Sequence, residues 1–291
     1  MEDKKSFSRV GFGLIIIFIA GLIFQTLVLR SRPFAVFDSS LIIVSNFIGM
    51  YGIGLPIFLY LFKDREKLDV PRKEKISFKE GFVLFTIGFA VMYVVNLGCT
   101  VIFTLLGAKI TNQLGETIMG LNIVSAFLLI VIIGPILEEL LFRKTLYRFS
   151  DTLGENGYII FSSIMFSLFH LNITQSIYTF FLGIILAYLY VKTGKLIVPI
   201  VMHMVVNFVG SIIPLLLFGS ETAVVFYSLI ALILVVAGLV FLIVNFSQVK
   251  AIFKTDNHFS LSQSVRNPGM IIFLILSIGM ILLGIFGAFF I

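Results

Sequence analysis

Long apolar stretches dominate the chain and alternate with short polar connections. A membrane-spanning helix needs about 20 mainly apolar residues. Such stretches predict spans at residues 10–29, 36–62, 81–106, 120–149, 157–171, 175–192, 196–218, 223–247 and 270–291. Because 157–171 is short and 36–62 contains Asp38, Asn46 and Pro56, we expect one of the two to be tilted or partly re-entrant. The pattern therefore predicts an all-α, polytopic transmembrane helix bundle with eight or nine spans.

The charged start of the chain is followed by the apolar stretch 10–29. That stretch is longer than the roughly 7–15 apolar residues of a signal peptide, and no small-residue cleavage site follows it. We therefore expect a retained first transmembrane helix. The longest polar stretches, 63–80 and 248–267, are too short to enclose a core of their own. Any chemistry is expected within the membrane.

The basic residues are divided unevenly among the connections. Lys and Arg concentrate in cytoplasmic loops. With the N-terminus inside, all of the 21 basic residues fall inside except Arg30, Arg32 and Lys109. This split predicts a multi-pass protein of the cell membrane with a cytoplasmic N-terminus, and an external C-terminus if there are nine spans.

Composition narrows the class of partner. Hydrophobic residues make up 59% of the chain and charged residues only 12%, which requires lipid as the solvent. The net charge of +6 does not indicate nucleic-acid binding, because the Lys and Arg residues flank apolar stretches and do not cluster with aromatic residues. Membrane lipid is the expected partner.

Two adjacent carboxylates occur near the end of the fourth predicted span. Glu138 and Glu139 follow Gly134-Pro135, and Arg143 comes four residues after Glu139. Residues at i and i+4 are neighbours on a helix, so Glu139 and Arg143 are spaced for an ion pair. Adjacent helical residues point about 100° apart, so Glu138 is expected to do a different job.

Two of the three histidines lie in predicted spans, and the third, His258, lies in a polar connection. His203 and Asn207 share one helix face. Counted from the cytoplasmic helix ends at about 1.5 Å per residue, Glu138, His170, His203 and Asn207 lie at depths of roughly 12–20 Å. If their helices are neighbours, these four side chains fall in one layer of the membrane.

A carboxylate, two imidazoles and an amide in a dry bundle could activate water and stabilise an oxyanion. Glu138, His170 and His203 could instead bind Zn²⁺ with an open position for water. The single cysteine, Cys99, provides neither a disulfide nor a thiolate metal site within the chain. Interhelical hydrogen bonding is the structural alternative for either histidine alone. So many costly groups in one layer favour a functional site.

These residues resemble the three motifs of the CAAX-protease and bacteriocin-processing (CPBP, or Abi) family of intramembrane proteases. The resemblance covers about residues 120–210, and it rests on the order and spacing of Glu138, Glu139 and Arg143, then Phe166 and His170, then His203 and Asn207. Each motif alone is weak, but together, on successive spans, they are fairly specific.

The resemblance implies a role for each matching residue. Glu138 would be the general base that activates water, and His170 would help to position or polarise that water. His203 and Asn207 would form the oxyanion site. Whether the chemistry uses zinc or only Glu and His stays open at this point.

The resemblance also implies that Glu139 and Arg143 hold the catalytic carboxylate in place. It divides the chain into N-terminal transmembrane helices with a cytoplasmic loop (1–119), a CPBP-like protease core (120–210) and C-terminal transmembrane helices (211–291). The expected activity is that of an intramembrane endopeptidase acting on membrane-associated peptides or proteins.

Two alternatives come from other functional classes. In a proton-coupled transporter, Glu138 and the histidines would form a proton relay. However, the chain has no matching pair of broken helices in its two halves. The other alternative is a non-catalytic bacteriocin-immunity protein, against which the complete set of motif residues argues.

Overall fold

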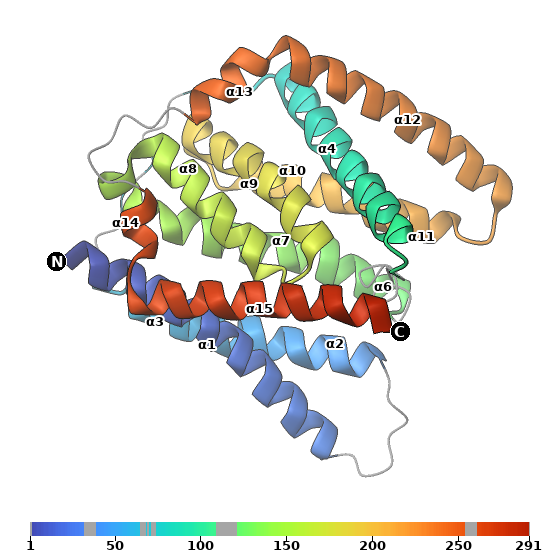
Figure 1. Cartoon of the computed structure of the whole chain (residues 1–291). Helices are drawn as coiled ribbons and strands as arrows, with labels where there is room; N and C mark the ends of the chain where they lie inside the picture. Colours follow the sequence, from blue (N-terminus) through green and yellow to red (C-terminus); the bar gives the residue numbers. More distant parts are fainter. Residues whose placement is uncertain are drawn as a thin grey trace. The chain divides into compact units, whose positions relative to one another are not determined.

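The computed structural model describes residues 2–31, 39–64, 68, 70, 74–108, 121–253 and 261–290. Within these ranges all regular structure is helical (Figure 1). Eight helices there are long and apolar enough to cross a membrane. The predicted fold class is confirmed, and the chain is a multi-pass membrane protein. Asp38, Lys109 and His258 lie outside the described residues.

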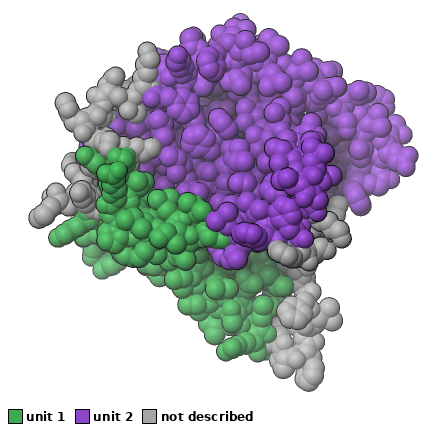
Figure 2. All heavy atoms as spheres, in the orientation of Figure 1, with its two compact units in different colours: residues 1–67, 112–122, 258–279 green, residues 68–111, 123–257, 280–291 purple. Residues whose placement is uncertain are grey.

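The chain divides into two compact units, which Figure 2 distinguishes by colour. Unit 1 comprises Met1–Lys67, Asn112–Asn122 and His258–Gly279. Unit 2 comprises Leu68–Thr111, Ile123–Asn257 and Met280–Ile291.

Unit 1 is built on α1 (Glu2–Arg30), which packs along a second, composite helix. That helix consists of α2 (Ser39–Phe47), the π-helix η1 (Ile48–Gly54) and α3 (Leu55–Leu61). Gly54 allows the two backbones to approach closely, because a Cβ there would lie 2.6 Å from the Cα of Ile17.

The remaining helices of unit 1 come from the C-terminal part of the chain. They are α14 (Leu261–Val265) and the first part of α15 (Pro268–Phe290), whose end belongs to unit 2. The backbone N–H of Gly269 donates to the Ser8 hydroxyl over 2.9 Å, which fixes α15 to α1.

In unit 2, α9 (Ile173–Thr193) is the most enclosed span, with 61% of its apolar window buried. It packs against α8 (Ser150–Phe169), α4 (Phe78–Leu105) and α10 (Ile197–Asn207). Its basic end is fixed by Lys192, which pairs with Glu80 at 2.5 Å and Glu74 at 3.3 Å.

The other helices of unit 2 lie around this centre. α12 (Glu221–Val244) packs on α4 but buries only 11% of its apolar window, so most of its surface is available to lipid. The π-helix η5 (Phe208–Ile212) and α11 (Ile213–Leu217) continue α10, and α13 (Phe246–Ile252) follows α12.

The predicted spans 120–149 and 157–171 are two legs of one helical segment, Ile123–Phe169. The first leg contains α6 (Ile123–Ala126), η2 (Phe127–Ile133), α7 (Gly134–Glu139), η3 (Leu140–Thr145) and η4 (Leu146–Phe149). The helical path is broken at Gly154, whose φ of 70° and ψ of 171° are not helical. The remainder of α8 packs against the first leg (Figure 1). The second leg, the remainder of α8, is the short one that the hydropathy pattern indicated.

Candidate active site

The six predicted site residues come from three helical segments of unit 2. Glu138 and Glu139 end α7, Arg143 follows in η3, His170 caps the C-terminal end of α8, and α10 carries the remaining two, His203 and Asn207. α7 and α10 are in contact, although they are far apart in the sequence.

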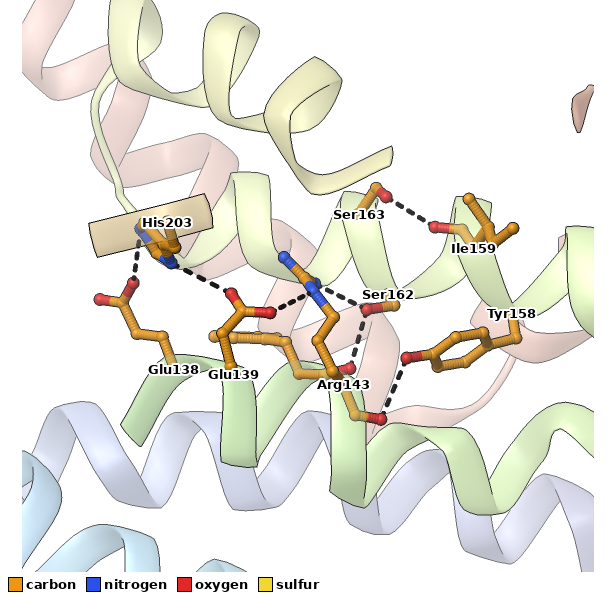
Figure 3. A network of polar contacts seen from close by, with 9 residues as sticks. Glu138, Glu139, Arg143, Tyr158, Ile159, Ser162, Ser163 and His203 are labelled. Carbon is orange, nitrogen blue, oxygen red and sulfur yellow. Dashed lines mark hydrogen bonds and ion pairs between the residues drawn. The ribbon is translucent and has the colours of Figure 1, made fainter. Parts of the chain in front are cut away.

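Glu139 is at the centre of a fully buried ion-pair network (Figure 3). Its Oε2 lies 2.9 Å from Nε of Arg143, which forms the i, i+4 pair that the spacing predicts. Its Oε1 lies 3.1 Å from Nδ1 of His203. Oε1 is therefore hydrogen-bonded, whereas Oε2 has an ion-pair contact without hydrogen-bond geometry. Neither Glu139 nor Arg143 exposes any side-chain surface.

Glu138 has different surroundings. Its Oε2 is 3.7 Å from Nε2 of His203, too long for a direct hydrogen bond but within ion-pair range. The Glu138 side chain is 18% exposed, whereas Glu139 is 0% exposed. Figure 3 shows His203 between the two carboxylates. Glu138 is therefore the carboxylate that water or a substrate can reach.

Arg143 has further partners that the sequence did not reveal. Its Nη1 donates to the Ser162 hydroxyl over 2.8 Å, and that hydroxyl donates to the Phe142 carbonyl. The guanidinium also lies 4.8 Å from the centre of the Phe166 ring, in a cation–π arrangement. The Tyr158 hydroxyl donates to the Arg143 carbonyl over 3.0 Å. These contacts hold the second leg of the segment against the first.

Sequence patterns alone could not identify Ser162 and Tyr158, because each is one of many hydroxyl residues in an apolar stretch. Phe166 could be identified from the sequence, because it belongs to the Phe166-x-x-x-His170 motif. Its ring packs edge-on against both His170, at 4.9 Å, and His203, at 5.6 Å.

His170 is held by its own helix end. Its Nδ1 lies 2.8 Å from the Phe166 carbonyl. Because a carbonyl only accepts, Nδ1 carries the proton and Nε2 retains its lone pair in the neutral ring. His170 lies within electrostatic reach of Glu138 and His203. The next residue, Leu171, has a φ of 53°, a strained backbone of the kind found at functional sites.

Asn207 contacts η2, which precedes Glu138 in the same helical segment. Its Nδ2 donates to the backbone carbonyl of Ile130 in η2 over 2.9 Å. The amide therefore has a fixed orientation, with its nitrogen toward η2.

Zinc binding by Glu138, His170 and His203 stays a prediction. No group of three or more His, Cys, Asp or Glu side chains in the described part of the chain is arranged to hold a metal ion.

Comparison with known proteins identifies the same part of the chain. Residues 120–209 match the family described as Type II CAAX prenyl endopeptidase Rce1-like. All six predicted site residues lie in that stretch. The resemblance to the CAAX-protease family is thereby confirmed.

Two bacterial relatives are also similar. The chain is 26% identical over 209 residues to the membrane-embedded CAAX protease MroQ of Staphylococcus aureus, covering 66% of this chain and 84% of that protein. It is 34% identical over 80 residues to YdiL of Bacillus subtilis, whose name describes it as a membrane peptidase, covering 26% of this chain and 32% of that protein. No solved structure matches.

Proposed function

We propose that residues 120–209, which match the Rce1-like endopeptidase family, form the core of an intramembrane endopeptidase that uses a glutamate-activated water. One observation carries the proposal. A partly exposed carboxylate, Glu138, lies beside a histidine that is itself held by a buried Glu139–Arg143 pair. Such support fixes the geometry of a reacting group in advance.

Glu138 is the proposed general base. It takes a proton from water, the water oxygen attacks the carbonyl carbon of the peptide bond, and the carbonyl oxygen becomes an oxyanion. The carbon–nitrogen bond then breaks, and the leaving amine takes the proton from Glu138. His170 interacts electrostatically with Glu138 and keeps a lone pair on Nε2 in its neutral form, and it is proposed to orient the water.

His203 and Asn207 are the proposed oxyanion donors. The Nδ1 proton of His203 is directed to Glu139, so Nε2 donates only when the ring carries a proton on both nitrogens. Asn207 has two amide N–H groups, and the contact with Ile130 uses one of them. The second is the one that would stabilise the tetrahedral intermediate.

Glu139 and Arg143 are proposed to hold Glu138 in place and not to take part in the reaction themselves. Adjacent helical residues share one backbone, so fixing Glu139 against Arg143 and His203 also limits the movement of Glu138.

The proposed substrates are peptides or proteins associated with the membrane, because the candidate site lies among membrane-spanning helices. We further propose location in the cell membrane with the N-terminus in the cytoplasm, from the distribution of basic residues. The comparisons do not favour the transporter or the non-catalytic immunity protein.

The test is cleavage by the purified protein. We expect the wild-type protein in detergent to cut members of a membrane-peptide library, with product ends mapped by mass spectrometry. Glu138→Gln retains the shape of the side chain but removes the basic oxygen, so it should abolish cleavage and leave the melting temperature near wild type. A Glu138→Gln protein that still cuts would rule out the general-base assignment.

A further inference from the structure

Three π-helical stretches in the described part of the chain end just before a proline. η1 (Ile48–Gly54) is followed by Leu55 and Pro56, η2 (Phe127–Ile133) by Gly134 and Pro135, and η5 (Phe208–Ile212) by Ile213 and Pro214. Short π-helical stretches occur frequently at functional sites. Two of them adjoin the candidate site: η2 directly precedes α7, which carries Glu138, and η5 directly follows α10, which carries His203 and Asn207.

The proline explains why each π-helical ladder stops. In a π-helix, an N–H donates to the carbonyl five residues earlier. The last such bond in η2 runs from Gly134 to the Leu129 carbonyl. The next bond would run from residue 135 to the Ile130 carbonyl, but Pro135 has no N–H. The Ile130 carbonyl is therefore left without its backbone donor.

The same geometry recurs at η5. Its last bond runs from Ile213 to the Phe208 carbonyl, and Pro214 cannot supply the next one, to the Val209 carbonyl.

Side chains from other helices donate to both of these carbonyls. Asn207 Nδ2 donates to Ile130 over 2.9 Å, and the Tyr227 hydroxyl donates to Val209 over 2.8 Å. A carbonyl without a donor costs several kcal/mol in a lipid environment, so each contact has a strong reason to persist. The position of the proline thus determines which carbonyl accepts a hydrogen bond from a side chain of another helix.

For Asn207 this contact determines which end of the amide faces η2. A carbonyl accepts only, so the nitrogen must face Ile130. If residue 135 had an N–H, that group could satisfy the carbonyl, and the carbonyl would no longer require the Asn207 nitrogen as its donor. A rotated amide can present its oxygen, which repels an oxyanion.

We propose that Pro135 is a positioning residue for the reaction: by leaving the Ile130 carbonyl free, it orients the Asn207 amide as an oxyanion donor. The proposal rests on the proposed function of Asn207. Gly134 supports the arrangement, because a Cβ there would lie 2.7 Å from the Leu129 carbonyl oxygen and disturb the π-helical turn.

The central variant is Pro135→Ala, which supplies the missing N–H. We expect kcat to fall about tenfold or more with KM unchanged, because an oxyanion donor acts mainly in the transition state. Asn207→Ala should lower kcat by about 10²–10³. In the Pro135→Ala background, Asn207→Ala should cost much less than in wild type, because the amide is already misplaced. Independent, multiplicative effects of the two changes would overturn the proposal.

Pro56→Ala is the matched control. It makes the same chemical change after the same kind of π-helical stretch, but in unit 1. It should leave kcat unchanged. An equal loss of kcat in Pro56→Ala would show that the loss in Pro135→Ala does not come from the contact with Asn207, and would overturn the proposal.

A second readout does not depend on activity. With asparagine-selective ¹⁵N labelling, the side-chain amide signal of Asn207 is identified by its absence from Asn207→Ala. Pro135→Ala should move this signal upfield as the hydrogen bond is lost, and Pro56→Ala should not. An unmoved signal overturns the proposal. If wild type cuts no substrate, the proposed function fails, and this signal alone still decides whether Pro135 orients Asn207.

The melting temperature separates positioning from misfolding. Pro135→Ala adds a backbone donor to a helix, so its stability should not fall below wild type. If it does not fold, Pro135→Gly provides the same N–H for both readouts. Failure of both variants to fold would assign Pro135 to folding alone and overturn the proposal.

Discussion

Glu138 and Glu139 are chemically identical neighbours whose surroundings differ. Glu139 is fully buried, and both its oxygens lie against cationic or donor groups. Glu138 keeps 18% of its side-chain surface exposed. Because adjacent helical residues point about 100° apart, one faces the packed interior while the other reaches the accessible site. At the residue scale, helix geometry therefore gives the two carboxylates different surroundings, which fits the different roles proposed for them.

This difference predicts that matched substitutions of the two glutamates differ in their effect on stability. Glu139→Gln removes the charge that pairs with the fully buried Arg143, and breaking a buried ion pair costs about 3–5 kcal/mol. Its melting temperature in detergent should fall clearly, and activity should fall with it. Glu138→Gln is the control, with lost activity and nearly unchanged stability. Equal loss of stability in both variants would contradict this division of roles.

At the element scale, α12 combines a lipid-exposed surface with the polar contacts of Tyr227. The Tyr227 hydroxyl donates to the Val209 carbonyl in η5 and lies 2.7 Å from the Tyr93 hydroxyl of α4. Val209 is two residues after Asn207, so this contact anchors the far end of the helix that carries the proposed oxyanion donors. A helix that buries little of its apolar surface thus contacts the helical segment that carries the proposed site.

Tyr227→Phe tests that anchor. It removes the donor to Val209 and leaves a carbonyl unsatisfied in an apolar environment, which should cost about 1–3 kcal/mol. We expect a lower melting temperature and a several-fold lower kcat. Tyr60→Phe is the control, because Tyr60 is 64% exposed on α3 and should change neither value. A Tyr227→Phe protein with unchanged melting temperature and kcat would show that the contact with Val209 does not anchor this helix.

At the scale of the whole molecule, function depends on how the spans cross the membrane. The basic residues predict that the connection after α3 is cytoplasmic and the one after α1 is external. Cys99 is the single cysteine of the chain, so a Cys99→Ser background permits labelling at single introduced positions.

A cysteine at Ser31, which is exposed, should react with a membrane-impermeant reagent on intact cells. A cysteine at the exposed Lys75 should react only after the membrane is permeabilised. The reverse pattern would overturn the proposed orientation. Labelling of both sites on permeabilised cells is the control for accessibility.

Local properties of the chain were readable from its sequence. Hydropathy over about 20 residues determines whether a stretch is stable in lipid, so the helical fold and the spans followed from composition alone. The Glu139–Arg143 pair followed from helix periodicity, because both residues lie on one element. The family resemblance also depended only on residue types and spacing.

The tertiary structure decided what depends on packing between distant segments. His203 reaches Glu139 across 64 residues, and Asn207 reaches Ile130 across 77. Hydropathy does not distinguish α-helical from π-helical hydrogen bonding, so it could not predict the π-helical stretches. It therefore could not predict which carbonyls lose their backbone donor at Pro135 and Pro214. Which carboxylate is buried also required the neighbouring helices, since exposure is set by packing between elements and not by the composition of one element.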